Sequence, residues 1–323
     1  MNFSRHNPTG LPRVTETCYV KGRDLQRPFT DMTPRDASLA TMAALLWGFN
    51  LIAGKIGVGA APPLFFTGLR FLLVAILVVP FCQVERKHWP SLFKLSVCFG
   101  VGHFALLFVG LAGVDAATAA ITLQLGVPFS ILISWLVFKE SFGWRRSLAL
   151  VLSFIGVAFL AGEPRNASWL PFVLLVTCTV FWAWSNILVK RMPDIKPLAI
   201  TGWLSMFAAP QVLFLSWLLE TGQGAAITNA GWPLVGALAY TAIAASIIAH
   251  ATWYSLMQKY PINTVVPFNM LIPIVGVGAG LLVLNEPLTW QKLMGGGLTL
   301  LGVGIIQWRV ARAAMSGKKT NVG

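Results

Sequence analysis

A few ionisable side chains interrupt long apolar stretches of this 323-residue chain. Arg70 and Lys55 are the cations among them, and such groups can bind carboxylates through charged hydrogen bonds. His103 and His250 lie in two other stretches, and histidine can exchange protons near neutral pH. Ionisable groups are expensive to bury in apolar surroundings and usually face the interior of a helix bundle. We therefore take these four residues as candidate functional residues.

Each of these groups also has a plainer interpretation. Lys55 lies near the end of its stretch, where a long side chain can snorkel to a membrane interface. Arg70 lies one to two turns into its stretch, where snorkelling and a role in a cavity both stay open. Lys190 is followed by Arg191 at the end of a stretch, a pattern typical of charges that set orientation. The histidines either sense protons or bond to a backbone carbonyl inside the bundle.

Amide and indole side chains within the stretches are the other candidates for recognising a substrate. Amides either hold helices together or form a ring of donors and acceptors around a polar ligand. Trp47 and Trp182 are the aromatic residues best placed to line a cavity, because they lie some way inside their stretches. The amides are Asn50, Gln124, Asn186 and Asn269.

The eleven acidic residues all fall in connections, at the ends of stretches or in the polar leader. A pump for lipophilic cations needs a buried carboxylate, whereas the embedded charges here are cationic. We therefore predict a neutral, zwitterionic or anionic small-molecule substrate, with Arg70 or Lys55 as its carboxylate partner. Glu286 and Glu140 are expected to cap the next helix or to pair with a nearby cation such as Lys292.

Ten apolar stretches must position these residues. Hydrophobic residues make up 56% of the chain and charged residues 11%, whereas a soluble domain carries about 25% charged residues. A spanning helix needs about 20 mostly apolar residues, and lipid leaves no backbone group unpaired. The chain is therefore expected to be an all-α membrane protein in contact with lipid. The predicted spans are Leu39–Val58, Leu64–Cys82, Leu92–Leu111, Ala117–Phe138, Ser147–Ala161, Trp169–Val189, Leu198–Leu219, Trp232–Leu256, Ile262–Leu284 and Leu293–Trp308.

The positive charges predict the orientation. Lys and Arg concentrate in the N-terminal segment, in alternate connections and at the C-terminus, while Arg165 and Lys292 lie on the other side. Both termini are therefore expected to be cytoplasmic. The formal charge of +13 is scattered between apolar stretches, which excludes a nucleic-acid-binding face. Residues 1–36 read as a disordered leader, in which Met32 is a plausible internal start, and residues 310–323 as a basic tail.

The last five spans repeat the first five, so we expect one repeat over residues 37–162 and another over 168–309. An odd number of spans per repeat places the second repeat upside down relative to the first, as in many transporters. The matching residues are Trp47-Gly-Phe-Asn50 with Trp182-Ala-Trp-Ser185, Pro63 and Thr67 with Pro197 and Thr201, and Glu140, Trp144 and Gly156 with Glu286, Trp290 and Gly302.

These motifs resemble the drug/metabolite transporter superfamily, and within it the EamA family of ten-helix exporters. The resemblance rests on Trp47-Gly-Phe-Asn50, on the opening of the second span up to Arg70-Phe71, and on Glu140 and Glu286; it covers residues 36–310. It implies an inner-membrane exporter of amino acids and related metabolites. Bacterial cysteine and O-acetylserine exporters are similar in the same pattern, including Leu123-Gln124.

We therefore predict a metabolite exporter that works by alternating access between the two repeats. A multidrug exporter of the same superfamily is the alternative. A membrane enzyme is disfavoured because the sequence has no HExxH, GxSxG or P-loop motif. No cofactor and no metal are expected, and the sequence leaves a monomer and a homodimer equally open.

Overall fold

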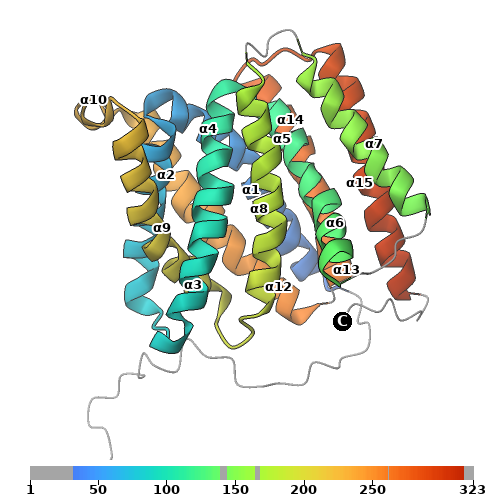
Figure 1. Ribbon diagram of the computed structural model, residues 1–323, viewed down its shortest axis with the longest axis horizontal. Coiled ribbons are helices and arrows are strands. Elements are labelled where there is room, and N and C mark those ends of the chain that lie inside the picture. Colours follow the sequence, from blue (N-terminus) through green and yellow to red (C-terminus); the bar gives the residue numbers. More distant parts are fainter. Residues whose placement is uncertain (1–31, 139–143, 164–167, 261, 316–323) are drawn as a thin grey trace, which may run out of the picture.

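The chain folds into a bundle of helices that run roughly side by side (Figure 1). The computed structural model describes residues 32–138, 144–163, 168–260 and 262–315. Every regular element in these ranges is helical. The α-helices are α1 Pro34–Ala60, α2 Pro63–Val78, α3 Trp89–Leu95, α4 Leu106–Gly113, α5 Ala116–Thr122, α6 Gly126–Phe138, α7 Trp144–Ala161, α8 Leu170–Lys190, α9 Pro197–Leu219, α10 Gln223–Thr228, α11 Trp232–Ala239, α12 His250–Lys259, α13 Ile262–Val265, α14 Leu271–Val283 and α15 Trp290–Met315.

Seven helical runs in the described residues are long and apolar enough to cross a membrane. They are Pro34–Ala60, Pro63–Phe81, Arg86–Gly113, Ala116–Ile133, Leu170–Val189, Pro197–Leu219 and Trp232–Trp253. The predicted fifth and ninth spans correspond to shorter apolar helices, Ser147–Ala161 and Pro267–Val283, and the predicted tenth lies within α15. All ten predicted stretches are thus helical, and seven of them have the length and apolarity to cross a membrane.

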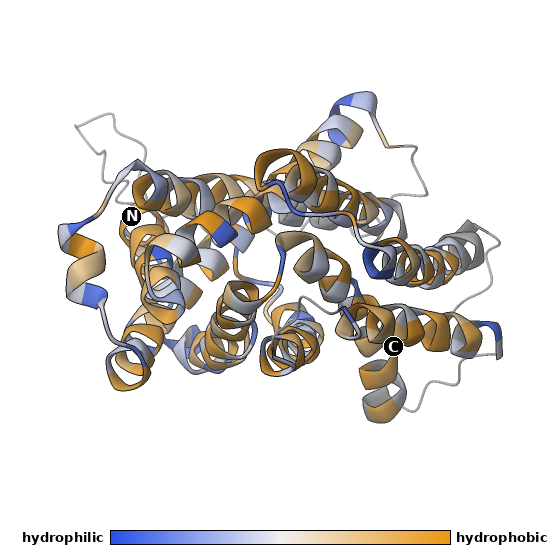
Figure 2. Ribbon diagram, turned by 90° about the horizontal axis from the view of Figure 1, so that it is seen from above, coloured by the Kyte–Doolittle hydropathy of each residue, from blue (hydrophilic) through white to orange (hydrophobic). Residues whose placement is uncertain are grey.

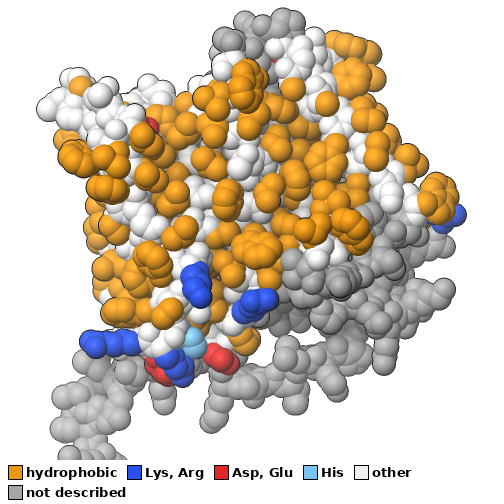
Figure 3. All heavy atoms as spheres, viewed as in Figure 1, with side chains coloured by type: hydrophobic (Ala, Val, Ile, Leu, Met, Phe, Trp, Pro, Cys, Tyr) orange, Lys and Arg blue, Asp and Glu red, His pale blue; other side chains and the backbone are white. Residues whose placement is uncertain are grey.

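The outer surface agrees with a membrane environment. Apolar side chains cover most of the face in view, and the Lys and Arg side chains visible there gather mainly at its lower edge (Figure 3). Seen from above, hydrophilic residues lie mainly in the connections and at helix ends (Figure 2). Large apolar residues such as Trp217, Trp232 and Leu282 are well exposed, which favours contact with lipid over contact with water.

The two halves share breaks in their helices that the sequence did not predict. Between α3 and α4 the chain forms the ten-residue π-helix η4 (Ser96–Ala105), and between α11 and α12 it forms the ten-residue π-helix η6 (Tyr240–Ala249). A 3₁₀ segment precedes α6 in one half, η5 (Leu123–Leu125), and another precedes α14 in the other, η7 (Val266–Met270). Such breaks often mark functional positions in helices.

The two most extensive helix contacts between the halves involve matching pairs. α2 packs along α9, and α7 packs along α15. In the second pair a Cβ atom on Gly156 would lie 2.5 Å from the backbone nitrogen of Thr299 and 2.6 Å from the carbonyl oxygen of Gly295. The two backbones therefore meet as closely as small residues permit.

Carboxylates from one half cap helices of the other at the upper end of the bundle in Figure 1, where α1 ends and α2 begins. Glu286 accepts hydrogen bonds from the backbone N–H groups of Ala116 (2.6 Å) and Ala117 (3.0 Å) at the start of α5. Glu220 does the same for Leu64 (2.7 Å) and Phe65 (3.0 Å) at the start of α2. Glu286 was expected to cap the next helix or to pair with a nearby cation such as Lys292, and it caps the start of the distant helix α5 instead. Glu140 lies outside the described residues.

Replacing Glu286 with alanine is expected to lower the free energy of unfolding by about 1–3 kcal/mol, because two buried N–H groups lose a charged acceptor. Thermal unfolding of the purified protein in detergent measures the effect. The matched control is Glu85→Ala, since Glu85 is exposed and pairs with the exposed Lys87. Equal unfolding temperatures for the two variants would contradict this role of Glu286.

Lys292 is the centre of a buried ion-pair cluster at the same end. Its ammonium pairs with Asp115 and, at 3.6 Å, with Glu163, and its side chain is 0% exposed. The Glu163 carboxylate, 1% exposed, also accepts hydrogen bonds from Thr118 (3.4 Å) and Thr289 (2.9 Å). The cluster joins the starts of α5 and α15 to the end of α7.

A second polar cluster lies at the lower end. Asp36 in the first turn of α1 accepts hydrogen bonds from Lys259 and Tyr260 at the end of α12. The hydrogen bond to the Asp36 carboxylate raises the pKa of the Lys259 ammonium, so this cation stays charged at physiological pH. Both ends of the bundle are therefore tied by contacts between the two halves.

Candidate functional site

Arg70 lies in the middle of α2 and is 1% exposed. Its Nε and Nη2 atoms donate hydrogen bonds to the hydroxyl of Ser246, at 3.1 and 2.8 Å. The guanidinium carbon lies 4.5 Å from the ring centroid of Phe104 and 5.4 Å from that of Phe108, which stabilises the cation through its interaction with the rings. The structure thus places Arg70 in the interior of the bundle and away from its surface.

Ser246 accepts from Arg70 through its oxygen lone pairs while it donates its own proton elsewhere. Its hydroxyl donates to the carbonyl oxygen of Thr241 at 2.8 Å, five residues earlier in the π-helix η6. No ion pair joins Arg70 to a carboxylate within the described part of the chain. A buried cation without a carboxylate is costly and marks a candidate binding site.

Both candidate histidines bond to backbone carbonyls. His103 Nδ1 lies 3.0 Å from the carbonyl oxygen of Cys178, and His250 Nδ1 lies 2.8 Å from that of Ala245. A carbonyl can only accept, so Nδ1 carries the proton in each case. The Phe99 ring stacks on His103 at 5.1 Å and meets His250 edge-on at 6.5 Å. The two imidazoles therefore flank one aromatic ring on the side of the bundle that holds Arg70.

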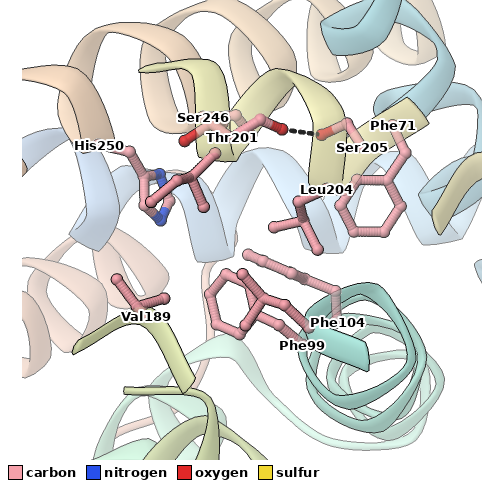
Figure 4. A pocket seen from close by; sticks show the side chains of 11 residues that line it. Phe71, Phe99, Phe104, Val189, Thr201, Leu204, Ser205, Ser246 and His250 are labelled. Carbon is pink, nitrogen blue, oxygen red and sulfur yellow. Dashed lines mark hydrogen bonds between the residues drawn. The ribbon is translucent and has the colours of Figure 1, made fainter. Parts of the chain in front are cut away.

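A small cavity opens beside these residues. Its volume is about 20 Å³, room for about one water molecule. Ser246 and His250 contribute polar groups, Thr201 and Ser205 face the same space from α9, and Phe71, Phe99 and Phe104 form an aromatic wall (Figure 4). Of these polar residues, His250 was a candidate from the sequence and Thr201 was marked by its match to Thr67. Ser205 and Ser246 were not predicted, because a serine in an apolar span ordinarily bonds to its own helix.

Trp47 lies against His250, whereas the Trp182 ring packs on a different helix start. The Trp47 indole N–H donates to the carbonyl oxygen of Ala245 at 3.1 Å, and its ring lies 5.0 Å from that of His250. The Trp182 ring instead packs on Gly126 at the start of α6, where a Cβ atom would lie 2.7 Å from it. Trp47 and Trp182 occupy matching positions in the two repeats, but the structure gives them different neighbours.

The four candidate amide side chains differ in their burial and in their hydrogen-bond partners. Asn50 is 7% exposed and Gln124 6% exposed, while Asn186 and Asn269 are half-buried. The Oδ1 atoms of Asn50 and Asn269 are buried without a hydrogen-bond partner among the described residues. Asn50 lies on α1 beside Trp47, whereas Asn269 lies on η7, so only the first is on the helix that reaches the Arg70 region.

Lys55 is held at a helix end. Its ammonium donates to the carbonyl oxygens of Leu111 (2.9 Å), Ala112 (3.2 Å) and Val114 (2.6 Å). These acceptors lie at the end of α4, where free carbonyls and the helix dipole favour a cation. Lys55 is thus engaged by the backbone near the upper end. Lys190 ends α8, and its side chain lies outside the part that the structure describes.

Comparison with known proteins identifies the class of molecule. The model of the EamA-like transporter family matches residues 36–162 and again residues 169–308. A Salmonella typhimurium protein named "Probable amino-acid metabolite efflux pump" is 28% identical over 295 residues, covering 88% of this chain and 99% of that protein. An Escherichia coli protein of the same name is 27% identical, covering 87% and 98%.

More distant relatives point the same way. A Chlamydia trachomatis protein named "S-adenosylmethionine/S-adenosylhomocysteine transporter" is 23% identical, covering 90% of this chain and 92% of that protein. A solved crystal structure with 16% sequence identity covers 87% of this chain and 99% of its own, with a TM-score of 0.63. At that identity the similarity bears on the fold alone.

Proposed function

Because the chain belongs to the EamA-like transporter family, we propose that it exports amino acids or their derivatives, of the cysteine or O-acetylserine kind, across the bacterial inner membrane. It is a small-molecule transporter and not an enzyme. The names of its Salmonella and Escherichia coli relatives support the substrate class. The observation that carries the proposal within the structure is the buried Arg70, which has no carboxylate partner among the described residues.

The transport mechanism that we propose is alternating access between two inverted five-helix repeats, residues 37–162 and 168–309. The double family match and the paired π-helices η4 and η6 support the repeat. The distribution of Lys and Arg supports ten spans with both termini in the cytoplasm. In this arrangement Glu286, Glu220 and Lys292 lie at the periplasmic end, and Asp36 and Lys259 lie at the cytoplasmic end.

Substrate counterflow in proteoliposomes tests the proposed function. Vesicles containing the purified protein are loaded with unlabelled cysteine, O-acetylserine or one of a panel of neutral amino acids, and uptake of the same labelled compound is followed. We expect transient accumulation for at least one of these compounds and none in protein-free vesicles. Efflux of cationic dyes without any amino-acid exchange would contradict the proposal and identify a multidrug exporter instead.

A further inference from the structure

Two unpartnered polar atoms in the interior have complementary chemistry. Within the described residues, Nη1 of Arg70 is a buried donor without an acceptor, and Oδ1 of Asn50 is a buried acceptor without a donor. Leaving such a group unsatisfied in the interior is unfavourable, and more so for a charged group. Two such groups in one region therefore call for a ligand that supplies an acceptor to the first and a donor to the second.

The contacts of α1 place Asn50 in the Arg70 region. Trp47, Asn50 and Gly54 share one face of α1, since residues three and four apart are neighbours on a helix surface. Trp47 donates to the carbonyl of Ala245, the residue before the Ser246 that binds Arg70. One turn beyond Asn50, a Cβ atom on Gly54 would lie 2.5 Å from the Phe108 ring.

Gly54 thus lies against Phe108, a ring that contacts Arg70, and Trp47 bonds to the residue next to Ser246. Phe108 lies beneath the guanidinium, and Ser246 accepts two of its N–H groups. Asn50 lies between these contacts on the same helix face. Its amide oxygen and the free guanidinium nitrogen therefore border the same part of the bundle interior, which also adjoins the cavity lined by Ser246 and His250.

We infer that Arg70 and Asn50 form a binding site for the backbone of a free α-amino acid. The carboxylate accepts from Arg70 Nη1 in a charged hydrogen bond, and the ammonium donates to Asn50 Oδ1. The side chain of the ligand lies against the aromatic wall of the cavity, which widens when the helices around it separate during alternating access. This inference rests on the proposed function and names the α-carboxylate and α-ammonium as the substrate groups that the transporter binds.

Competition by blocked amino acids tests the site in the wild-type protein. The amino acid that exchanges fastest in counterflow is challenged with itself, with its C-terminal amide and with its N-acetyl derivative. The amide lacks the carboxylate, and the N-acetyl compound lacks the ammonium. We expect each to compete at least tenfold more weakly than the free amino acid. Competition by the amide as strong as that by the free amino acid would overturn the inference.

Two variants then assign each group to its residue. Arg70→Gln is expected to bind the free amino acid at least tenfold more weakly and to lose discrimination against the amide, while it still rejects the N-acetyl compound. Asn50→Leu is also expected to bind the free amino acid more weakly. It should lose discrimination against the N-acetyl compound, while it still rejects the amide. The matched controls are Arg86→Gln and Asn229→Leu, because both residues are exposed. Size-exclusion chromatography in detergent shows that each variant is folded.

The outcomes separate the site from the function. Amino-acid exchange by Arg70→Gln with wild-type affinity and unchanged discrimination would overturn the site and leave the exporter standing. Arg70→Lys provides a second check, since it keeps the charge and is expected to retain more discrimination against the amide than Arg70→Gln. Absence of any amino-acid exchange by the wild-type protein would overturn the proposed function, and the substrate class of the site with it.

Discussion

Replacement of Lys292 by methionine is expected to lower the free energy of unfolding by about 3–5 kcal/mol. Methionine has nearly the same length but no charge, so the variant leaves Glu163 buried without its cation and Asp115 without its partner. Burying an unpaired carboxylate costs far more than the pair itself contributes. Thermal unfolding in detergent, followed by the fluorescence of the 13 tryptophans, measures the loss.

The matched control for this prediction is Lys87→Met. Lys87 pairs with Glu85 on the surface, with side-chain exposures of 65% and 51%, and an exposed pair contributes less than about 1 kcal/mol. Adding Glu163→Gln to Lys292→Met is expected to recover part of the loss, because it removes the uncompensated charge. If the single variants at Lys292 and Lys87 unfold at the same temperature, the cluster does not stabilise the bundle.

Replacement of Gly156 by valine is expected to lower the free energy of unfolding by about 3 kcal/mol, near the upper end of the usual cost of overpacking. The new side chain would meet the backbone nitrogen of Thr299 and the carbonyl of Gly295 at 2.5 and 2.6 Å. Backbone atoms cannot rotate aside as a flexible side chain can, so α7 and α15 would have to separate. The same unfolding measurement detects this change.

Gly297→Val is the control for the helix contact. Gly297 lies on α15 like Gly295, but a Cβ atom there would meet nothing within 4 Å. The same substitution should therefore leave stability nearly unchanged or raise it slightly, because valine forms helix better than glycine. A Gly156 variant as stable as the Gly297 variant would show that the two helices adjust without cost.

The sequence predicts the spans better than their internal geometry. Apolar length is a local property, so each predicted stretch is helical in the structure. The π-helices η4 and η6 have no local signal, because an i→i+5 hydrogen bond depends on what packs against that turn. The 3₁₀ segment η7 contains Pro267, and it explains why the predicted span Ile262–Leu284 is not one continuous α-helix.

The candidate site was partly visible in the sequence. Arg70 could be singled out because a cation is costly to bury in an apolar stretch and is usually kept there for a function. Ser246 could not, because a buried hydroxyl that bonds to its own helix is common, and only the fold brings it to Arg70. Lys55 was equally conspicuous in the sequence, yet its acceptors are carbonyls at the end of α4, about 56 residues further along the chain.

The carboxylate caps also bear on how the protein is assembled during synthesis. The N–H group of Leu64 at the start of α2 is satisfied by Glu220, 156 residues later, and that of Ala116 at the start of α5 by Glu286, 170 residues later. When the first half leaves the ribosome, the carboxylates that accept hydrogen bonds from these two helix starts have not yet been synthesised. The first half therefore stays unfinished in the membrane until the second half is inserted beside it.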